Sequence, residues 1–176
     1  MRTDQTNTAV MAGIRALAFD VDGVLTDGGV WWGLEGAEFK RFGFADIMGL
    51  SLARRAGLML GLISGEDTPL IDRLAAKLSI AFVVKGTRDK AAALQAFAAF
   101  ADIAIEQVGF MGDDVNDLPA LRVAGLSAAP ADAAADVLAS VQFVAQRSGG
   151  HGAARDLVEA LLHARGLTAE EAFSRG

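Results

Sequence analysis

The sequence predicts an α/β domain with a Rossmann-like, doubly wound and mainly parallel sheet. Short apolar runs alternate with helical stretches at the intervals typical of βα units. Four of the five runs are continuously apolar, as expected for parallel strands buried on both faces. The chain has 176 residues, of which 52% are hydrophobic. This length allows one well-buried core and is short for two, so we expect a single domain.

Five β-type runs are the predicted strands: Ile14–Phe19, Leu58–Ile63, Ala81–Val84, Val108–Met111 and Val141–Val144. The predicted helices are Asp46–Ala56, Thr68–Leu78, Asp89–Ala101, Asn116–Ala124 and about Ala153–Ala164. Thr68 is a favourable N-cap residue, and Gly57 and Gly125 follow the ends of their helices, where glycine is common.

The segment Gly28–Phe42 breaks the βα pattern. Two tryptophans, Trp31 and Trp32, precede a Gly33–Gly36 turn and a second short β-type run. This pattern indicates a β-hairpin that projects from the sheet as a flap. Because adjacent strand residues point to opposite faces, one tryptophan needs a second surface to cover it.

The two ends of the chain lie outside the predicted domain, which spans residues 14–165. Met1–Gly13 is polar and lacks the apolar stretch of a signal peptide, so we expect a frayed leader. Residues 166–176 are expected to form a C-terminal tail. The absence of cysteine excludes disulfides and thiolate zinc sites and favours the cytoplasm.

Charge and hydropathy exclude several classes of partner. The net charge is −6 and the pI is near 4.8. These values argue against nucleic acid or an anionic membrane as the main partner. The most apolar tract, Ala91–Ile105, is too short to cross a bilayer and contains Gln95 and Asp102. An anionic substrate would need local positive charge from lysines or a metal ion.

Two carboxylates, Asp20 and Asp22, immediately follow the first predicted strand. In open α/β sheets, ligands bind at the carboxyl ends of the strands. On an extended backbone, residues two apart point the same way, so both carboxylates can face one crevice while Gly23 lets the chain turn. The alternative interpretation is an Asp-Gly turn with solvated acids.

A second acidic group follows the strand Val108–Met111. Gly112 precedes Asp113 and Asp114, with Asn116 and Asp117 within the next turn. Converging carboxylates repel one another unless a cation neutralises them, and oxygen ligands favour Mg²⁺. Acids that cap the following helix are the alternative, but they do not account for the whole cluster.

Ser64, Gly65 and Lys90 complete a predicted phosphate site. Ser64 ends the second strand, and its hydroxyl can hold phosphoryl oxygens together with nearby backbone N–H groups. Lys90 begins a helix, where its ammonium can offset negative charge. Taken singly, Ser64 is an ordinary N-cap residue and Lys90 a solvated lysine. Their order along the chain with the two acidic motifs favours chemistry.

With these motifs, the chain from about Ile14 to Arg155 resembles phosphatases of the haloacid dehalogenase superfamily. The extended motif Phe19–Gly28, the segment Gly149–Arg155 and the absence of a cap-domain insertion resemble the capless sugar-acid branch. That branch includes 3-deoxy-manno-octulosonate 8-phosphate and ketodeoxynonulosonate 9-phosphate phosphatases. The resemblance therefore implies a phosphorylated 2-keto-3-deoxy sugar acid as the substrate.

The resemblance also implies roles for the motif residues. Asp20 would attack phosphorus to form an aspartyl-phosphate, and Asp22 would act as general acid and then general base. Mg²⁺ would be held by Asp20, the backbone carbonyl of Asp22, and Asp113. Ser64, Gly65 and Lys90 would bind the phosphoryl group. Three further residues would contact the metal ligands or serve as alternative ligands: Asp114, Asn116 and Asp117.

Two residues bear on the choice of sugar. The octulosonate enzymes usually carry Thr-Gly-Arg at the second motif, whereas this chain has Ser64, Gly65 and Glu66. Glu66 and Lys77 resemble the nine-carbon enzymes, so we expect a nonulosonate 9-phosphate first and an octulosonate 8-phosphate next. We place both residues on the helix after Ser64, on one shared face. Ordinary surface charge is the alternative for both.

The capless branch is typically a homotetramer, because a neighbouring subunit covers the open site. The flap, Val30–Phe42, and the segment Gly149–Arg155 would approach the next subunit. A non-catalytic assembly or regulatory domain of the same fold is an alternative, but the intact motifs argue against it. A receiver-type signalling domain is another, but it carries its adjacent acid pair on the first strand rather than late in the chain.

Overall fold

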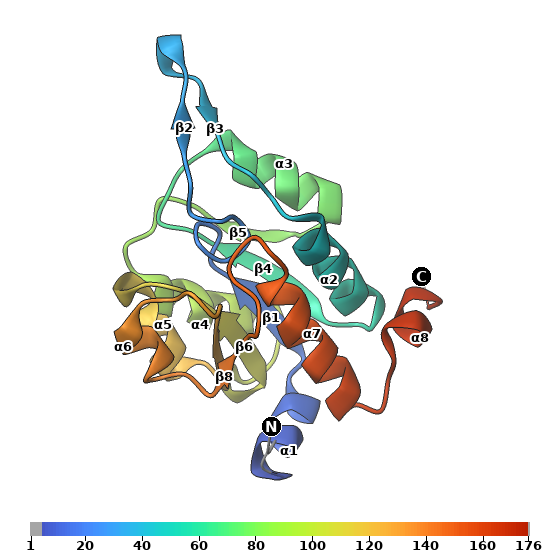
Figure 1. The fold of residues 1–176 in the computed structure, drawn as a ribbon. Helices are drawn as coiled ribbons and strands as arrows, with labels where there is room; N and C mark the ends of the chain where they lie inside the picture. The colour runs from blue at the N-terminus through green and yellow to red at the C-terminus, as the bar shows by residue number, and fades with distance from the viewer. Residues whose placement is uncertain (1–4, 176) are drawn as a thin grey trace.

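The computed structural model, which describes residues 5–175, contains a six-stranded parallel sheet with helices on both faces (Figure 1). The strand order is β5-β4-β1-β6-β7-β8. The strands are β1 (Ala16–Phe19), β4 (Met59–Ile63), β5 (Phe82–Val84), β6 (Val108–Met111), β7 (Leu126–Ala129) and β8 (Phe143–Val144). From β1 the chain builds outward to β5, then returns to build the other half from β6. The order therefore reverses between β1 and β6, where doubly wound sheets bind ligands.

The sequence predicted five of these strands and missed β7. The predicted run Val141–Val144 is a strand only over Phe143–Val144. In β7, Leu126–Ala129, two alanines and a serine give little strand propensity. The strand forms because it pairs with β6 on one side and β8 on the other, and all four of its residues are buried.

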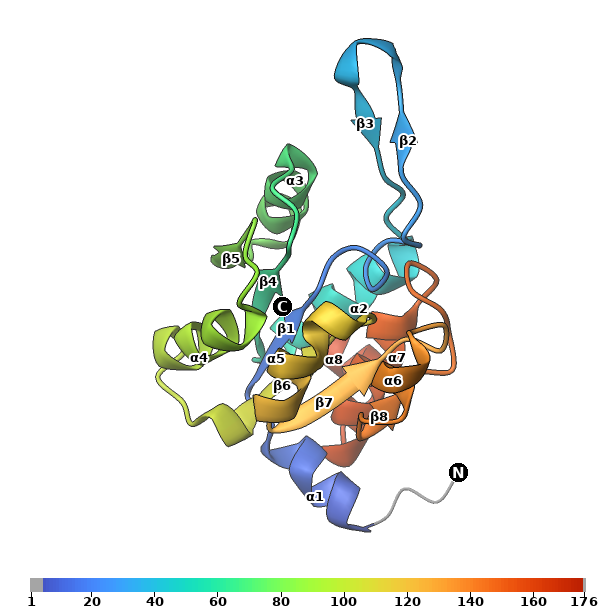
Figure 2. The same cartoon turned by 90° about the vertical axis from the view of Figure 1, so that its left-hand side faces the viewer.

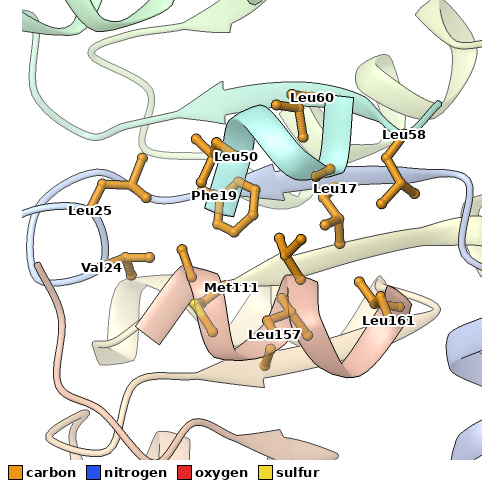
Figure 3. Close-up of a cluster of buried hydrophobic side chains, with 14 of the residues drawn as sticks. Leu17, Phe19, Val24, Leu25, Leu50, Leu58, Leu60, Met111, Leu157 and Leu161 are labelled. Atoms are coloured by element: carbon orange, nitrogen blue, oxygen red, sulfur yellow. The ribbon is translucent and has the colours of Figure 1, made fainter. Parts of the chain in front are cut away.

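Alternate residues of the strands enter two cores on opposite sides of the sheet. On one side, Leu17 and Phe19 pack with Met111 and with residues of α2 (Phe44–Arg55) and α7 (Ala153–Ala164), as Figure 3 shows. The small Ala16 and Ala18 face the other side, where α4 (Lys90–Phe100) packs closely. The same side holds α5 (Leu118–Val123) and α6 (Ala135–Leu138). The two cores fix β1 in the centre of the molecule.

Helix α3 (Pro69–Leu78) and three short 3₁₀ segments lie in the connections between the strands of the described chain. The 3₁₀ segments are Leu34–Gly36, Ile105–Gln107 and Val115–Asp117. Thr68 caps α3 as predicted, because its hydroxyl accepts a hydrogen bond from the Leu70 N–H. The predicted helix Asn116–Ala124 is instead divided between the last 3₁₀ segment and α5.

Both ends of the described chain pack on the domain. Helix α1 (Gln5–Gly13) buries Met11 in the core where we expected a frayed leader, whose residues 1–4 lie outside the described residues. Within the expected tail, α8 (Ala169–Phe173) lies against α2. There the Arg55 guanidinium lies 4.6 Å from the ring centroid of Phe173 and donates to its carbonyl. Apolar burial at both ends outweighs their polar composition.

The predicted flap is present as an antiparallel pair of strands, β2 (Trp31–Trp32) and β3 (Glu38–Phe39). It projects away from the sheet beyond the carboxyl ends of the strands (Figure 2). Both tryptophans are exposed, and so are Leu34 at the tip and Phe39. Across residues 5–175, none of the helices has the length and apolarity needed to cross a bilayer.

Candidate active site

The carboxyl ends of β1, β4 and β6 meet at a cavity of about 250 Å³. Asp20 follows β1, Ser64 follows β4, and Gly112 and Asp113 follow β6. The cavity is lined by residues of all four predicted motifs: Asp20, Asp22, Gly23, Gly28, Ser64, Gly65, Glu66, Lys90, Asp113, Asp114 and Asn116. The structure thus brings together the predicted site residues except Asp117, which lies buried beside them, and Lys77.

Lys90 holds two of the acids together. Its ammonium lies 2.9 Å from Oδ1 of Asp20 and 2.6 Å from Oδ1 of Asp117. The other carboxylate oxygen of Asp117 accepts hydrogen bonds from the backbone N–H groups of Asp113 and Asp114. Asp117 is fully buried and already bonded on both oxygens, so it orients Lys90 and the turn after β6.

Two acids of this cluster, Asp20 and Asp113, carry raised pKa values. Burial raises the pKa of Asp20 to about 7, and the charge of Asp117 adds to the shift against the lowering effect of Lys90. Burial, with the charges of Asp20 and Asp117, raises the pKa of Asp113 to about 8. Oxygens of the three carboxylates lie within 4.8 Å of one another. One lysine does not balance three such acids, so the cluster fits an additional cation.

Asp22 lines the cavity and forms an ion pair with the flap. The Lys40 ammonium lies 2.8 Å from Oδ1 of Asp22 and 3.5 Å from Oε1 of Glu38. Burial opposes the charged form of Lys40, but these two carboxylates outweigh it and raise its pKa. A side chain outside the four motifs therefore holds one of the two acids after β1.

The loop after β4 presents Ser64 and Glu66 to the cavity. Ser64 is buried, its hydroxyl accepts a hydrogen bond from the Glu66 N–H at 3.0 Å, and its carbonyl accepts one from the Thr87 N–H. The hydroxyl proton remains available for a phosphoryl oxygen. Helix α3 begins only at Pro69. The expectation that Glu66 and Lys77 share one helical face is therefore wrong, because Glu66 precedes the helix.

Lys77 lines a second cavity of about 460 Å³ between α3 and the base of the flap. Its lining combines apolar side chains with three cations: Lys40, Phe42, Ile47, Leu70, Arg73, Leu74 and Lys77. Glu66 lines the first cavity and Lys77 the second, so the structure separates the two residues that were expected to choose the sugar.

Two glycines let the motifs approach each other closely. Gly23 has a positive φ of 79°, and a Cβ at this position would overlap the carboxylate of Asp113. A Cβ at Gly112 would overlap the carboxylate of Asp117. Both positions require glycine if the carboxylates are to stay where they are.

The segment Gly149–Arg155 packs against the active-site loop of its own chain. The Gly150 N–H donates to the Val24 carbonyl at 3.0 Å. The carboxylate of Asp46, in the first turn of α2, accepts hydrogen bonds from the N–H groups of Gly152 and Ala154 at the start of α7. This loop therefore supports the site from within the subunit, and its expected approach to a neighbouring subunit stays a prediction.

Sequence reasoning gave no role to Lys40 or Asp46. Lys40 lies two residues after Glu38, and on a strand this spacing places both side chains on one face. That alternation was the available signal for the pair with Glu38, and nothing local marked the contact of Lys40 with Asp22. An acid in the first turn of a helix normally stabilises its own helix, so nothing local marked Asp46 as a partner for residues more than 100 positions away.

Known proteins with similar sequences share this arrangement of elements. The model for haloacid dehalogenase-like hydrolases matches residues 67–157. The 3-deoxy-D-manno-octulosonate 8-phosphate phosphatase KdsC of Escherichia coli is 35% identical over 153 residues, covering 87% of this chain and 81% of that protein. The corresponding Haemophilus influenzae protein is also 35% identical and covers the same share of this chain and 85% of its own.

Solved structures agree with the sequence comparison. A Moraxella catarrhalis 3-deoxy-D-manno-octulosonate 8-phosphate phosphatase, in complex with magnesium, phosphate and KDO, superposes with a TM-score of 0.88 at 31% identity, covering 90% of this chain and 91% of that one. A putative HAD superfamily (subfamily III A) hydrolase from Legionella pneumophila reaches 0.92 at 33% identity, covering 96% and 92%. The matching motifs, sequence and fold show that the chain belongs to the haloacid dehalogenase-like hydrolase family.

Proposed function

We propose that this phosphatase hydrolyses the phosphomonoester of a 2-keto-3-deoxy sugar acid through an aspartyl-phosphate on Asp20. One observation carries the proposal: Asp20 lies at the switch point of the sheet, in contact with Lys90 and in one cavity with Asp22 and Ser64. A carboxylate in that position can attack phosphorus when nearby donors offset its repulsion from phosphate.

In the first half-reaction, an oxygen of Asp20 bonds to phosphorus while the bond from phosphorus to the sugar oxygen breaks. The proton of Asp22 passes to that departing oxygen. In the second half-reaction, water attacks phosphorus, its proton passes to Asp22, and the bond to Asp20 breaks. Ser64 and Lys90 hold the phosphoryl oxygens in both, so positioning and electrostatics supply most of the catalysis.

The acidic cluster fits Mg²⁺. Asp20 and Asp113, with the backbone carbonyl of Asp22, would hold the ion, while Asp117 is engaged by Lys90 and two backbone N–H groups. Bound Mg²⁺ would neutralise charge on the phosphoryl group and orient it toward the attacking carboxylate. The raised pKa values of Asp20 and Asp113 support a cation at this position, because both acids are destabilised in their charged forms without one.

The length of the sugar separates two versions of the proposal. The similarity to octulosonate 8-phosphate phosphatases supports an eight-carbon substrate. Glu66, which faces the active-site cavity where those enzymes usually carry arginine, supports the nine-carbon substrate predicted from the sequence. A carboxylate accepts hydrogen bonds from sugar O–H or N–H groups, whereas an arginine at this position could only donate them to sugar oxygens.

We further propose a homotetramer in which the flap closes a neighbouring site. The exposed tryptophans on β2 and the cavity beside Lys77 support this assembly, because a second subunit could cover apolar surface that one subunit leaves open. Lys77 would then contact a sugar carboxylate bound next door while Glu66 serves its own subunit.

The test is an assay of the purified protein with Mg²⁺ against three substrates: 3-deoxy-manno-octulosonate 8-phosphate, ketodeoxynonulosonate 9-phosphate and p-nitrophenyl phosphate. We expect kcat/KM to be highest for a sugar acid and Asp20→Asn to be inactive on all three. The ratio between the two sugars decides the chain length. Absence of phosphate release from every substrate would favour the non-catalytic alternative.

A further inference from the structure

Lys40 connects the flap to the active site. Only 3% of its side chain is exposed, although it lies at the base of an otherwise exposed hairpin. Its ammonium lies 2.8 Å from Asp22, which is 28% exposed and lines the active-site cavity. Lys40 itself lines the second cavity. The side chain therefore forms part of the wall between the two cavities.

The backbone around Lys40 is held by the loop that carries Asp22. Phe42, two residues on, forms an antiparallel bridge with Thr26. The Thr26 hydroxyl in turn accepts hydrogen bonds from the N–H groups of Gly23 and Gly28. The base of the flap and the turn after β1 thus form one hydrogen-bonded unit, and the ion pair between Lys40 and Asp22 closes it.

The two buried lysines of the site have different partners. Lys90 contacts the nucleophile Asp20, so it can act on the phosphoryl group. Lys40 contacts Asp22 and Glu38 and does not line the phosphate cavity. Loss of Lys40 should therefore affect proton transfer at the leaving oxygen more than phosphate binding.

We propose that Lys40 is a positioning residue that holds the carboxyl group of Asp22 in line with the leaving sugar oxygen and the attacking water. The inference rests on the proposed function of Asp22. Because Lys40 belongs to the flap, proton transfer by Asp22 then depends on the position of the flap.

Lys40→Met tests this proposal, since it keeps an apolar stem of similar length and removes the cation. On the sugar-acid phosphate, we expect kcat to fall about 10- to 100-fold with KM changed less than about threefold, a part of what general acid–base catalysis contributes. With p-nitrophenyl phosphate, whose leaving group needs no proton, a rapid burst of p-nitrophenol should remain, followed by slowed turnover. Lys40→Arg should recover part of the loss.

Lys85→Met is the matched control. Lys85 also pairs with two carboxylates, Asp67 at 3.0 Å and Asp72 at 2.7 Å, but it lines neither cavity. This variant should keep both the sugar-phosphate rate and the burst. Thermal melting of each variant in the presence of Mg²⁺ establishes that it is folded.

The proposal is overturned if Lys40→Met retains wild-type turnover of the sugar phosphate, or if the burst disappears together with the turnover. A Lys40→Arg rate no higher than that of Lys40→Met also counts against it. A wild-type protein that releases phosphate from neither substrate would instead overturn the proposed function. Active wild type with an unaffected Lys40→Met overturns only the role of Lys40.

Discussion

In the active site at the carboxyl ends of the strands, Asp20, Lys90 and Asp117 are each at most 5% exposed. On the flap, by contrast, Trp31 and Trp32 are 67% and 79% exposed. The acids and the lysine contact one another and receive backbone hydrogen bonds from within the same chain. The flap has one short pair of strands and several exposed apolar side chains. The candidate phosphate site is therefore preorganised inside one subunit, while the flap, which we propose covers a neighbouring site, is open to solvent.

The largest loss of activity is expected on substitution of Asp20, the proposed nucleophile. Asp20→Asn should lower kcat by about 10⁴-fold or more on every substrate, because the amide cannot form the acyl-phosphate. Steady-state kinetics and trapping of labelled phosphate on the protein provide the measurement. Asp102→Asn, an exposed acid before β6, should behave as wild type. Substantial activity in Asp20→Asn would remove this residue from its role.

Gly23→Ala tests how closely the loop after β1 and the Asp113 carboxylate are packed. The new Cβ would overlap the carboxylate of Asp113, so we expect the Mg²⁺ concentration for half-maximal activity to rise by about tenfold or more. Gly57→Ala is the control, because Gly57 has a similar positive φ of 82° but no neighbour within 4 Å of an added Cβ. An equal rise in the Mg²⁺ concentration for half-maximal activity in both variants would show that backbone strain, rather than overlap with the Asp113 carboxylate, causes the effect.

Substrate choice should respond to Glu66 and Lys77 without loss of the phosphate chemistry. Glu66→Ala should lower kcat/KM for the sugar-acid phosphate by about 10- to 100-fold, the value of a charged hydrogen bond, and spare p-nitrophenyl phosphate. Lys77→Ala should do the same only under conditions where the subunits assemble. Glu170→Ala on α8 serves as a surface control. Equal losses on both substrates would place these residues in catalysis instead.

The flap should contribute to assembly and little to the stability of the subunit. Trp31→Ala with Trp32→Ala should raise the dissociation constant of the tetramer by about tenfold or more. The free energy of unfolding of the subunit should stay within about 0.5 kcal/mol, since both side chains are exposed. Sedimentation velocity over a range of concentrations measures the first quantity. A wild-type protein that is monomeric and fully active would contradict the proposed tetramer.

The stability of the metal-free protein should depend on pH. The pKa values of Asp20 and Asp113 rise from 3.8 in their ordinary state to about 7 and about 8. Between these values the folded chain keeps protons that the unfolded chain has lost, so the free energy of unfolding falls as pH rises from about 4 to about 8. Mg²⁺ should therefore raise Tm more near pH 8 than near pH 5. Asp113→Asn should flatten both trends.

The group of residues at the carboxyl ends of the strands was predictable because local sequence patterns mark it. Asp20, Ser64 and Asp113 each follow a continuously apolar run, and parallel strands place such residues at one edge. Strand β7 was missed because its residues have little preference for a strand, and pairing on both sides decides its conformation. Helices α1 and α8 were read as loose ends because their tertiary contacts are not visible in local composition.

The contacts that join the flap and the C-terminal loop to the site were not predictable from spacing. Lys40 meets Asp22 across a hairpin, and Asp46 meets Gly152 across most of the domain. Such contacts are set by the tertiary structure of the whole domain rather than by local sequence. Glu66 was placed on the helix after Ser64, although the predicted helix bounds, Thr68–Leu78, exclude it. The structure begins this helix at Pro69 with Thr68 as its N-cap, which agrees with those bounds.

The position of the aromatic residues gives this protein an intrinsic optical probe. The chain contains two tryptophans and no tyrosine, and both tryptophans lie on strand β2 of the flap. Indole emission from the whole protein therefore originates from one short segment. A solvated indole emits at longer wavelengths than one in an apolar contact, so a blue shift on adding substrate or raising protein concentration would report coverage of the flap without any attached dye.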